Sequence, residues 1–296
     1  MTLRWPATLL ALLAALVLGA CGGGSPEVPE SPPTPLLYTI ASPGGEIEGW
    51  LFGTIHALPD GVEWRTPALE EAAAQADLLV VEIAALEDQA AIAHTFAALA
   101  SSPGQPEIGA RVAPSQRQDL YRLIERGGYK PEDFAAIETW AAALMLAQNS
   151  DGGSSRNGAD RALLADFAAR DIRELEGTAR QLGIFDRLPP RDQADLLAGV
   201  IIEARERAYD PDKLRRAWLA GDEAALVKAT SSGILADPEL RQALLVDRNR
   251  DWARQIAPML EATLRPLVAV GAAHLVGPQG LAELLRQRGY TVERLP

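Results

Sequence analysis

Cysteine and histidine are scarce in this sequence. Its 296 residues include one cysteine and three histidines. A single cysteine excludes a disulfide within the chain, so the fold depends on its hydrophobic core. The chain has the material for such a core, because 48% of its residues are hydrophobic. With so few histidines, each one can be weighed separately for a chemical role.

Positive charge is also in short supply. The sequence has 28 Lys and Arg residues against 40 Asp and Glu residues, which gives a net charge of -12 and a pI of about 4.8. Proteins that bind DNA or RNA normally carry a basic surface that neutralises phosphates. We therefore expect no nucleic-acid partner.

Motifs of several common enzyme classes are absent. The sequence contains no Gly-x-Ser-x-Gly elbow, no Walker loop, no Gly-x-Gly-x-x-Gly after a predicted strand and no His-Glu-x-x-His. These absences argue against a serine hydrolase of that type, a P-loop nucleotidase, a dinucleotide-binding enzyme and a zinc protease with both histidines on one helix.

Long apolar runs are missing except at the N-terminus. Arg4 precedes "PATLLALLAALVLGA", a run too short for a membrane-spanning helix of about 20 residues. This is the layout of a secretory signal peptide. Residues 18–21 resemble a bacterial lipobox, in which Cys21 becomes the lipidated first residue of the mature chain. The alternative is a plain signal peptide that happens to contain a cysteine.

The next segment, residues 22–35, is rich in Gly and Pro and is typical of a flexible tether. We therefore expect a signal peptide at 1–21, a tether at 22–35 and a folded domain at 36–296. A lipid on Cys21 would attach the protein to a membrane of the bacterial cell envelope. Gly22, rather than Asp, after the cysteine favours the outer membrane, with the domain facing the periplasm.

The two ends of the folded part show the same pattern. "GWLFGTIH" leads through a loop and a helix to "DLLVVE", and "LVAVGAAH" leads through a loop and a helix to "YTVERL". Both units read strand, Gly-x-x-His, loop, helix, strand, and a crossover of this length predicts parallel pairing within each unit. Residues 86–251 are mainly helical by periodicity, with a short strand at "IRELEG". The pattern predicts an α/β (α+β) fold, with a sheet built from both termini and a helical insertion.

His56 and His274 end the two Gly-x-x-His motifs. The carboxyl ends of strands in an open α/β sheet are where such folds bind ligands, so the two side chains are expected to converge. Either motif alone would indicate no more than a strand end with a surface histidine. His94 lies in an Ala-rich helical stretch, where a lone histidine is usually structural.

Acidic residues also follow predicted strands. Glu82 ends a buried strand, where an unpaired carboxylate is costly, although the strand could simply emerge into solvent there. Glu174 and Glu176 end another strand, and alternation predicts that both lie on the same face. Asp160 and Arg248 are weaker candidates, because an exposed acid and a solvated arginine are the ordinary interpretation.

Two histidines and a glutamate are a common ligand set for a divalent catalytic metal. His56, His274 and Glu82 are therefore the predicted metal ligands. The ion would be divalent, and a water bound at an open position on it would have a lowered pKa.

These residues lie in segments that resemble the TraB/PrgY/GumN family, which includes the Tiki metalloproteases. The segments are "FGTIHALP", "LLVVEI", "LEGTARQ", "DRNRDWA" and "VAVGAAHLVGPQGLAELLRQRGY", and the resemblance covers about 36–296. It implies a fold akin to erythromycin esterase and the haem-linked lipoprotein ChaN. It also implies that His56, Glu82 and His274 are the family's core polar positions, with the pair Arg248-Asn249 and the glutamate Glu176 as further motif residues. Tiki members are divalent-metal proteases that use manganese or cobalt.

The leading hypothesis is an envelope-anchored, metal-dependent hydrolase that acts on a peptide or another small substrate. Glu82 would be the third ligand or the general base, Arg248 would stabilise negative charge, and Glu176 would complete the catalytic set. The alternatives are a non-catalytic lipoprotein that binds haem, a peptide or a signalling molecule, and a scaffold protein of the same fold.

Overall fold

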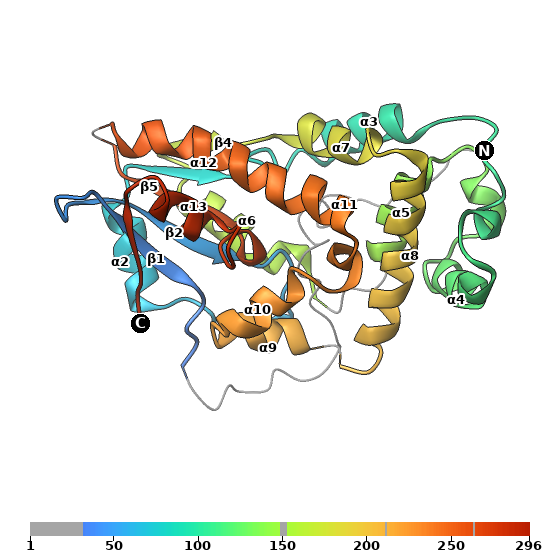
Figure 1. Cartoon of the computed structure of the whole chain (residues 1–296), viewed down its shortest axis with the longest axis horizontal. Helices are drawn as coiled ribbons and strands as arrows, with labels where there is room; N and C mark the ends of the chain where they lie inside the picture. Colours follow the sequence, from blue (N-terminus) through green and yellow to red (C-terminus); the bar gives the residue numbers. More distant parts are fainter. Residues whose placement is uncertain (1–31, 149–152, 211, 263) are drawn as a thin grey trace.

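The computed structural model of the chain describes residues 32–148, 153–210, 212–262 and 264–296 (Figure 1). The predicted signal peptide, its lipobox Cys21 and the tether up to residue 31 lie outside the described residues. Within the described ranges, no helix combines the length and the hydropathy needed to cross a membrane.

Six strands form one mixed sheet at one end of the molecule. Their order across the sheet is β4-β3-β5-β2-β1-β6. In chain order they are β1 (Leu37–Ala41), β2 (Ile47–Thr54), β3 (Leu78–Val81), β4 (Asp171–Glu174), β5 (Pro266–Gly271) and β6 (Thr291–Arg294). The predicted α/β fold, built from both ends of the chain, is confirmed. The middle of the chain adds one edge strand, β4.

The strand pairing differs from the prediction within each terminal unit. β5 lies between β2 and β3 and is parallel to both, so the two strands of the first unit are not neighbours. β6 pairs with β1 in antiparallel fashion and does not touch β5. The reason is burial: β5 is apolar and buried at every position, which requires neighbours on both edges. β4 and β6, with exposed charged residues, occupy the edges instead.

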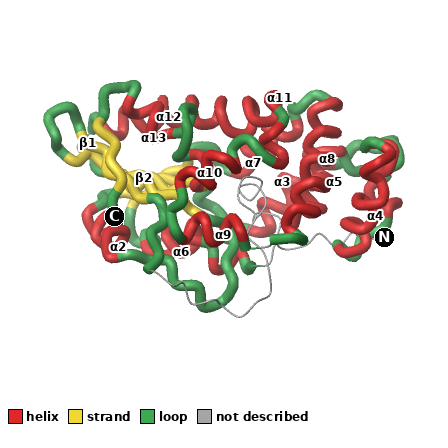
Figure 2. The backbone as a smooth tube through the Cα atoms, turned by 60° about the horizontal axis from the view of Figure 1, so that its bottom comes forward, coloured by secondary structure: helices red, strands yellow, loops and turns green. Residues whose placement is uncertain are grey.

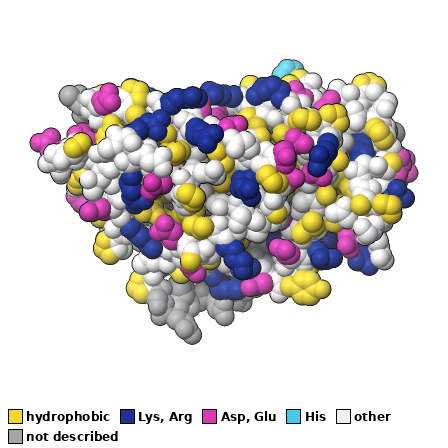
Figure 3. Space-filling model, viewed as in Figure 1, with side chains coloured by type: hydrophobic (Ala, Val, Ile, Leu, Met, Phe, Trp, Pro, Cys, Tyr) yellow, Lys and Arg dark blue, Asp and Glu magenta, His cyan; other side chains and the backbone are white. Residues whose placement is uncertain are grey.

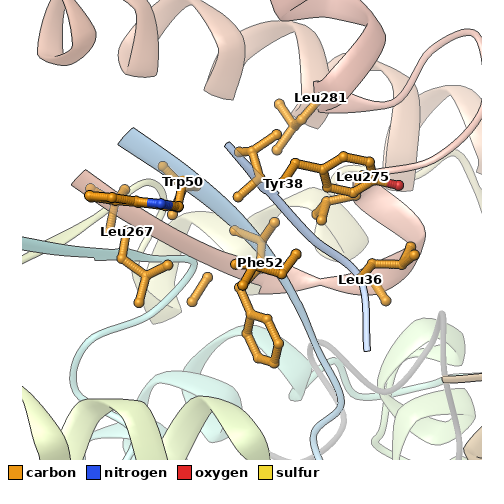
Figure 4. Packing of buried hydrophobic residues seen from close by; sticks show 14 of the residues in the cluster. Leu36, Tyr38, Trp50, Phe52, Leu267, Leu275 and Leu281 are labelled. Atoms are coloured by element: carbon orange, nitrogen blue, oxygen red, sulfur yellow. The ribbon is translucent and has the colours of Figure 1, made fainter. Parts of the chain in front are cut away.

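Helices cover both faces of the sheet. Figure 2 shows α12 (Asp247–Leu260) and α13 (Leu281–Arg286) on one face and α2 (Pro67–Gln75) and α6 (Ala159–Asp166) on the other. The core between these layers holds large side chains from β1, β2 and β5. Tyr38 lies beside Leu275 and Leu281, whereas Phe52 points to the opposite side (Figure 4).

The helical middle of the chain has a core of its own beside the sheet. Its centre is α5, in which every residue from Trp140 to Ala147 is buried. The helices with this core are α3 (Gln89–Ala100), α4 (Arg117–Arg126), α5 (Thr139–Ala147), α7 (Thr178–Asp186), α8 (Pro190–Arg207) and α11 (Pro238–Arg241), and they lie to the right of the sheet in Figure 1. Two further helices of the middle, α9 (Lys213–Leu219) and α10 (Glu223–Ala229), pack against the core of the sheet instead. The predicted helical middle is therefore confirmed.

The glycine of the first Gly-x-x-His motif is required for space. Neither this glycine nor its counterpart in the second motif has a positive φ, so a backbone bend is not the reason for it. A Cβ on Gly53 would lie 2.9 Å from the Ala272 Cβ and 3.0 Å from its Cα. The end of β2 can therefore pack directly against the turn that follows β5.

Both signs of charge are mixed on the molecular surface. Figure 3 shows acidic and basic side chains interspersed over one face, with Lys and Arg side chains gathered along its upper edge.

Candidate functional site

Four parallel strands deliver polar residues to the same edge of the sheet. β2, β5, β3 and β4 run in the same direction, so their carboxyl ends lie side by side. His56 follows β2, Glu82 follows β3, Glu176 follows β4, and His274 ends the 3-10 turn after β5. Arg248 reaches them from the first turn of α12. All five residues predicted from the sequence therefore gather at one buried place.

The Arg248 guanidinium lies at the centre of this cluster. Nε and Nη2 donate to the two carboxylate oxygens of Glu176 over 2.9 and 3.0 Å, and Nη2 also donates to Glu82 over 2.8 Å. Nη1 donates to the Leu244 carbonyl over 3.1 Å and lies 3.2 Å from His274 Nε2. All five N–H groups are thus engaged. Burial lowers the pKa of Arg248, but the two carboxylates raise it above its ordinary value.

Glu82 is held as an anion inside the protein. Its Oε1 accepts a hydrogen bond from the Gly271 N–H over 2.9 Å, and its Oε2 accepts from Arg248 and from Gln181 Nε2 over 3.2 Å. Burial raises the pKa of Glu82, but Arg248 and, to a lesser degree, the two histidines and the Gly271 N–H lower it to about 2. A carboxylate with such a low pKa suits a ligand better than a general base.

Hydrogen bonds fix the tautomer of His274. The Gln279 carbonyl only accepts, so Asn249 donates to it through Nδ2 over 2.8 Å and presents Oδ1 to His274. His274 Nδ1 lies 2.6 Å from that oxygen and must carry the proton, which leaves Nε2 as the acceptor for Arg248. Trp252 packs on the ring with 4.4 Å between centroids. Burial lowers the pKa of His274, and Arg248 lowers it further, to about 3.

His56 has a different partner. Its Nδ1 lies 3.1 Å from Asp160 Oδ2. Its Nε2 is buried and has no hydrogen-bond partner in the described part of the chain. Burial lowers the pKa of His56, but the carboxylates of Asp160 and, to a lesser degree, Glu82 raise it, and the net shift is upward. A buried imidazole nitrogen without a partner is unusual in a folded protein and points to a ligand or a reacting group.

Three of these side chains converge on Gly271. A Cβ on this glycine would lie 3.4 Å from Glu82 Oε1, 3.4 Å from His56 Nε2 and 3.6 Å from His274 Cδ2. Nevertheless, among the residues that the structure describes, no three His, Cys, Asp or Glu side chains form a group ready to hold a metal. Arg248 Nη1 lies 3.2 Å from His274 Nε2 and occupies it. The donors fit a divalent cation through His56 Nε2 and Glu82 Oε1, and His274 can join only when Arg248 Nη1 releases it.

The charges of the cluster also favour an additional cation. Three carboxylates, those of Glu82, Glu176 and Asp160, face one guanidinium, which leaves two negative charges if both histidines are neutral. Buried charges without compensation are costly. Protonation of His56 would compensate one of them, and a divalent cation would compensate both.

A surface pocket reaches the cluster from the side of Arg248. It has a volume of ≈ 380 Å³ and lies between α7, the start of α8 and the start of α12. Glu176 and Arg248 line it, and Arg248 donates both to Glu176 and, further inward, to Glu82. Arg248 therefore separates the pocket from the buried carboxylate and from His274.

Some sequence expectations were wrong in detail. Glu174 and Glu176 do not share a face: β4 ends at Glu174, which accepts from the Ala84 N–H at the surface, whereas Glu176 turns inward to Arg248. Arg248 is 5% exposed and not the solvated arginine of the ordinary interpretation. His94 is exposed on α3 and takes no part in the cluster.

The sequence interpretation also missed participants. Gln181 donates to Glu82, and Trp252 Nε1 donates to Glu176 over 3.0 Å. Both lie in segments that carried the family resemblance, "LEGTARQ" and "DRNRDWA". The sequence indicates only an exposed acid at Asp160, because nothing in its local sequence shows that the loop before α6 packs against His56.

Comparisons with known proteins identified relatives of the chain. The model of the TraB/PrgY/gumN family matches residues 36–294. The chain is 25% identical over 256 residues to a Shigella flexneri protein named "Uncharacterized protein YbaP", a match that spans 83% of this chain and 90% of that protein. The protein of the same name from Escherichia coli (strain K12) is 25% identical over 245 residues, which span 80% and 87% of the two chains.

A shorter match links the chain to a protease. "Metalloprotease TIKI2" from Danio rerio is 37% identical over 62 residues, which are 20% of this chain and 12% of that protein. No solved structure matches the chain.

The lowered pKa of His274 predicts a pH-dependent stability of the metal-free protein. Between pH 6.5 and 3 the unfolded chain binds a proton on His274 that the folded protein excludes, so stability falls as the pH falls, by at most about 1.4 kcal/mol per pH unit. His56, whose pKa is raised, acts in the opposite direction. Urea unfolding with a chelator at pH 7 and pH 5 should show a smaller loss for His274→Gln than for the wild type.

The matched control is His94→Gln, which changes an exposed histidine on α3 and should follow the wild type. Equal pH dependence in His274→Gln and the wild type would mean that His274 is not kept neutral by its burial and by Arg248.

Proposed function

The chain belongs to the TraB/PrgY/gumN family, and from this premise we propose that it is a hydrolase that uses a divalent cation, manganese, cobalt or zinc, to cleave a peptide or amide bond. The partial similarity to a metalloprotease supports the reaction class. Family membership shows a fold more firmly than an activity, so the proposed reaction rests on the geometry of the site.

One observation carries this proposal: the buried Nε2 of His56 has no partner and converges with the ionised Glu82 on Gly271. Asp160 binds the opposite nitrogen of the ring, an arrangement that metal-binding histidines usually show. With both histidines neutral, the two uncompensated negative charges of the cluster add an electrostatic reason for a cation.

Each residue of the cluster would then have a separate role. His56 Nε2 and Glu82 Oε1 would hold the ion, and His274 Nε2 would join them. A bound divalent cation supplies a water of lowered pKa and polarises a carbonyl oxygen. Arg248 keeps Glu82 ionised and places its positive charge at the inner wall of the pocket, where negative charge on a substrate would be stabilised. Glu176 holds Arg248 in position through two hydrogen bonds.

Neither histidine of the site is placed to bind haem. Axial ligation requires a histidine or tyrosine presented to a large cavity. His56 and His274 line neither the pocket beside Arg248 nor the larger one of ≈ 550 Å³ between α8, α9 and α10.

Substitutions at the convergence point test the metal site. We expect His56→Ala and His274→Ala to abolish Mn²⁺ uptake, measured by calorimetry and elemental analysis, without unfolding the protein. Gly271→Ala should do the same, because its Cβ would enter the space between the ligands while φ of -49° and ψ of 131° remain allowed for alanine. Cleavage of a peptide library with Mn²⁺ should be lost in all three variants.

His94→Ala provides the control and should keep both uptake and cleavage. If His56→Ala and His274→Ala bind Mn²⁺ or Zn²⁺ at the wild-type stoichiometry, the site is misassigned. If the wild type holds no metal and cleaves nothing when metal is added, the chain is a scaffold or binding protein of this fold.

We further propose that the protein is a lipoprotein of the bacterial cell envelope, anchored through Cys21 to the outer membrane and facing the periplasm. The lipobox-like residues 18–21 and the Gly/Pro-rich tether support this placement. Cys21→Ala should move the protein from the membrane fraction to the soluble fraction of fractionated cells. Retention of the variant in the membrane fraction would contradict the anchor.

A further inference from the structure

His56 is enclosed by two segments that are far apart in the sequence. The Ala159 N–H donates to the Ile55 carbonyl over 2.9 Å, and Leu58 exchanges two backbone hydrogen bonds with Ser154. A Cβ on Gly158 would lie 2.4 Å from the His56 carbonyl oxygen, so the two backbones are in direct contact. The start of α6 is therefore fixed against the strand end that carries His56.

Asp160 lies at this junction, in the first turn of α6. Its Oδ2 is 3.1 Å from His56 Nδ1, whereas its Oδ1 is buried without a hydrogen-bond partner in the described part of the chain. The ordinary interpretation of an acid at this position is a favourable interaction with the helix N-terminus. That interpretation does not explain why the carboxylate is turned toward an imidazole and has its second oxygen unpaired.

The contact determines which nitrogen of His56 can act. An ionised carboxylate only accepts hydrogen bonds, so His56 Nδ1 must carry the proton. In the neutral ring, Nε2 then has a free lone pair, and this is the atom that converges with Glu82 on Gly271. His274 is held in the same way through Asn249, with an amide oxygen in place of a carboxylate.

We propose that Asp160 is a positioning residue of the site, which holds His56 in the Nδ1–H tautomer and thereby directs the Nε2 lone pair toward Glu82. This inference rests on the proposed function, in which Nε2 binds the cation. Carboxylates that orient a metal-binding histidine typically contribute a factor of about 10 to 100 in metal affinity.

The direct test is the tautomer itself, observed by ¹H–¹⁵N NMR of the metal-free protein. Only three histidine rings contribute signals. The spectra are recorded with a chelator, at a pH above the His56 midpoint found in the same titration. We expect wild-type His56 as a single Nδ1–H tautomer. Asp160→Ala should convert it to a mixture of the Nδ1–H and Nε2–H forms, whereas His274 stays unchanged.

Two variants distinguish a positioning role of Asp160 from a purely structural one. Asp160→Asn keeps an oxygen acceptor and should retain the Nδ1–H form, so it tests rescue by a conservative change. Asp166→Ala removes an exposed acid of the same helix, which pairs with Arg65, and should leave the His56 signals unchanged. Wild-type His56 in the Nε2–H form, or an Nδ1–H population that Asp160→Ala leaves unaltered, would overturn the proposal.

Mn²⁺ affinity gives the second readout. We expect a fall of about 10- to 100-fold in Asp160→Ala and no change in Asp166→Ala. The two proposals can then fail separately. If the His56 tautomer depends on Asp160 but the protein does not bind Mn²⁺, the positioning role is supported and the metal site is contradicted. Normal Mn²⁺ affinity and an unchanged tautomer in Asp160→Ala would contradict the positioning role alone.

Discussion

The rest of the site depends on one buried guanidinium. Arg248 binds Glu82 and Glu176 at once beneath α12, and its positive charge compensates these buried carboxylates. These contacts tie the start of α12 to the carboxyl ends of β3 and β4. They also orient His274, whose lone pair accepts from the same side chain. The positions of a strand edge, a helix and a histidine are thus determined together.

This arrangement creates an asymmetry between the two histidines. His274 is bound by an amide and an arginine; burial and the arginine lower its pKa, and the arginine occupies its lone pair. His56 is bound by a carboxylate, and its opposite nitrogen has no partner in the described ranges. The two Gly-x-x-His motifs look equivalent in the sequence, yet only one presents an open ligand atom. Entry of a cation between them would require Arg248 to move away from His274.

The main parts of the fold and site followed from local patterns. Buried strands that end in a polar residue are visible in the sequence, and parallel strands must bring such residues to one edge, so the convergence of His56, Glu82 and His274 could be predicted. The position of β5 between β2 and β3 could not, because pairing depends on which apolar strand is covered on both sides. The burial of Arg248 and the contact of Asp160 with His56 also depend on long-range packing, which no local pattern encodes.

The most direct test of this arrangement measures the free energy of unfolding in urea for Arg248→Met, alone and combined with Glu82→Gln and Glu176→Gln. Removal of the arginine alone leaves two buried carboxylates unpaired, and we predict a loss of about 3 to 5 kcal/mol. The triple variant should regain at least half of that loss, because its amides carry no charge. An Arg248→Met variant as stable as the wild type, or a triple variant less stable than the single one, would contradict the central role of Arg248.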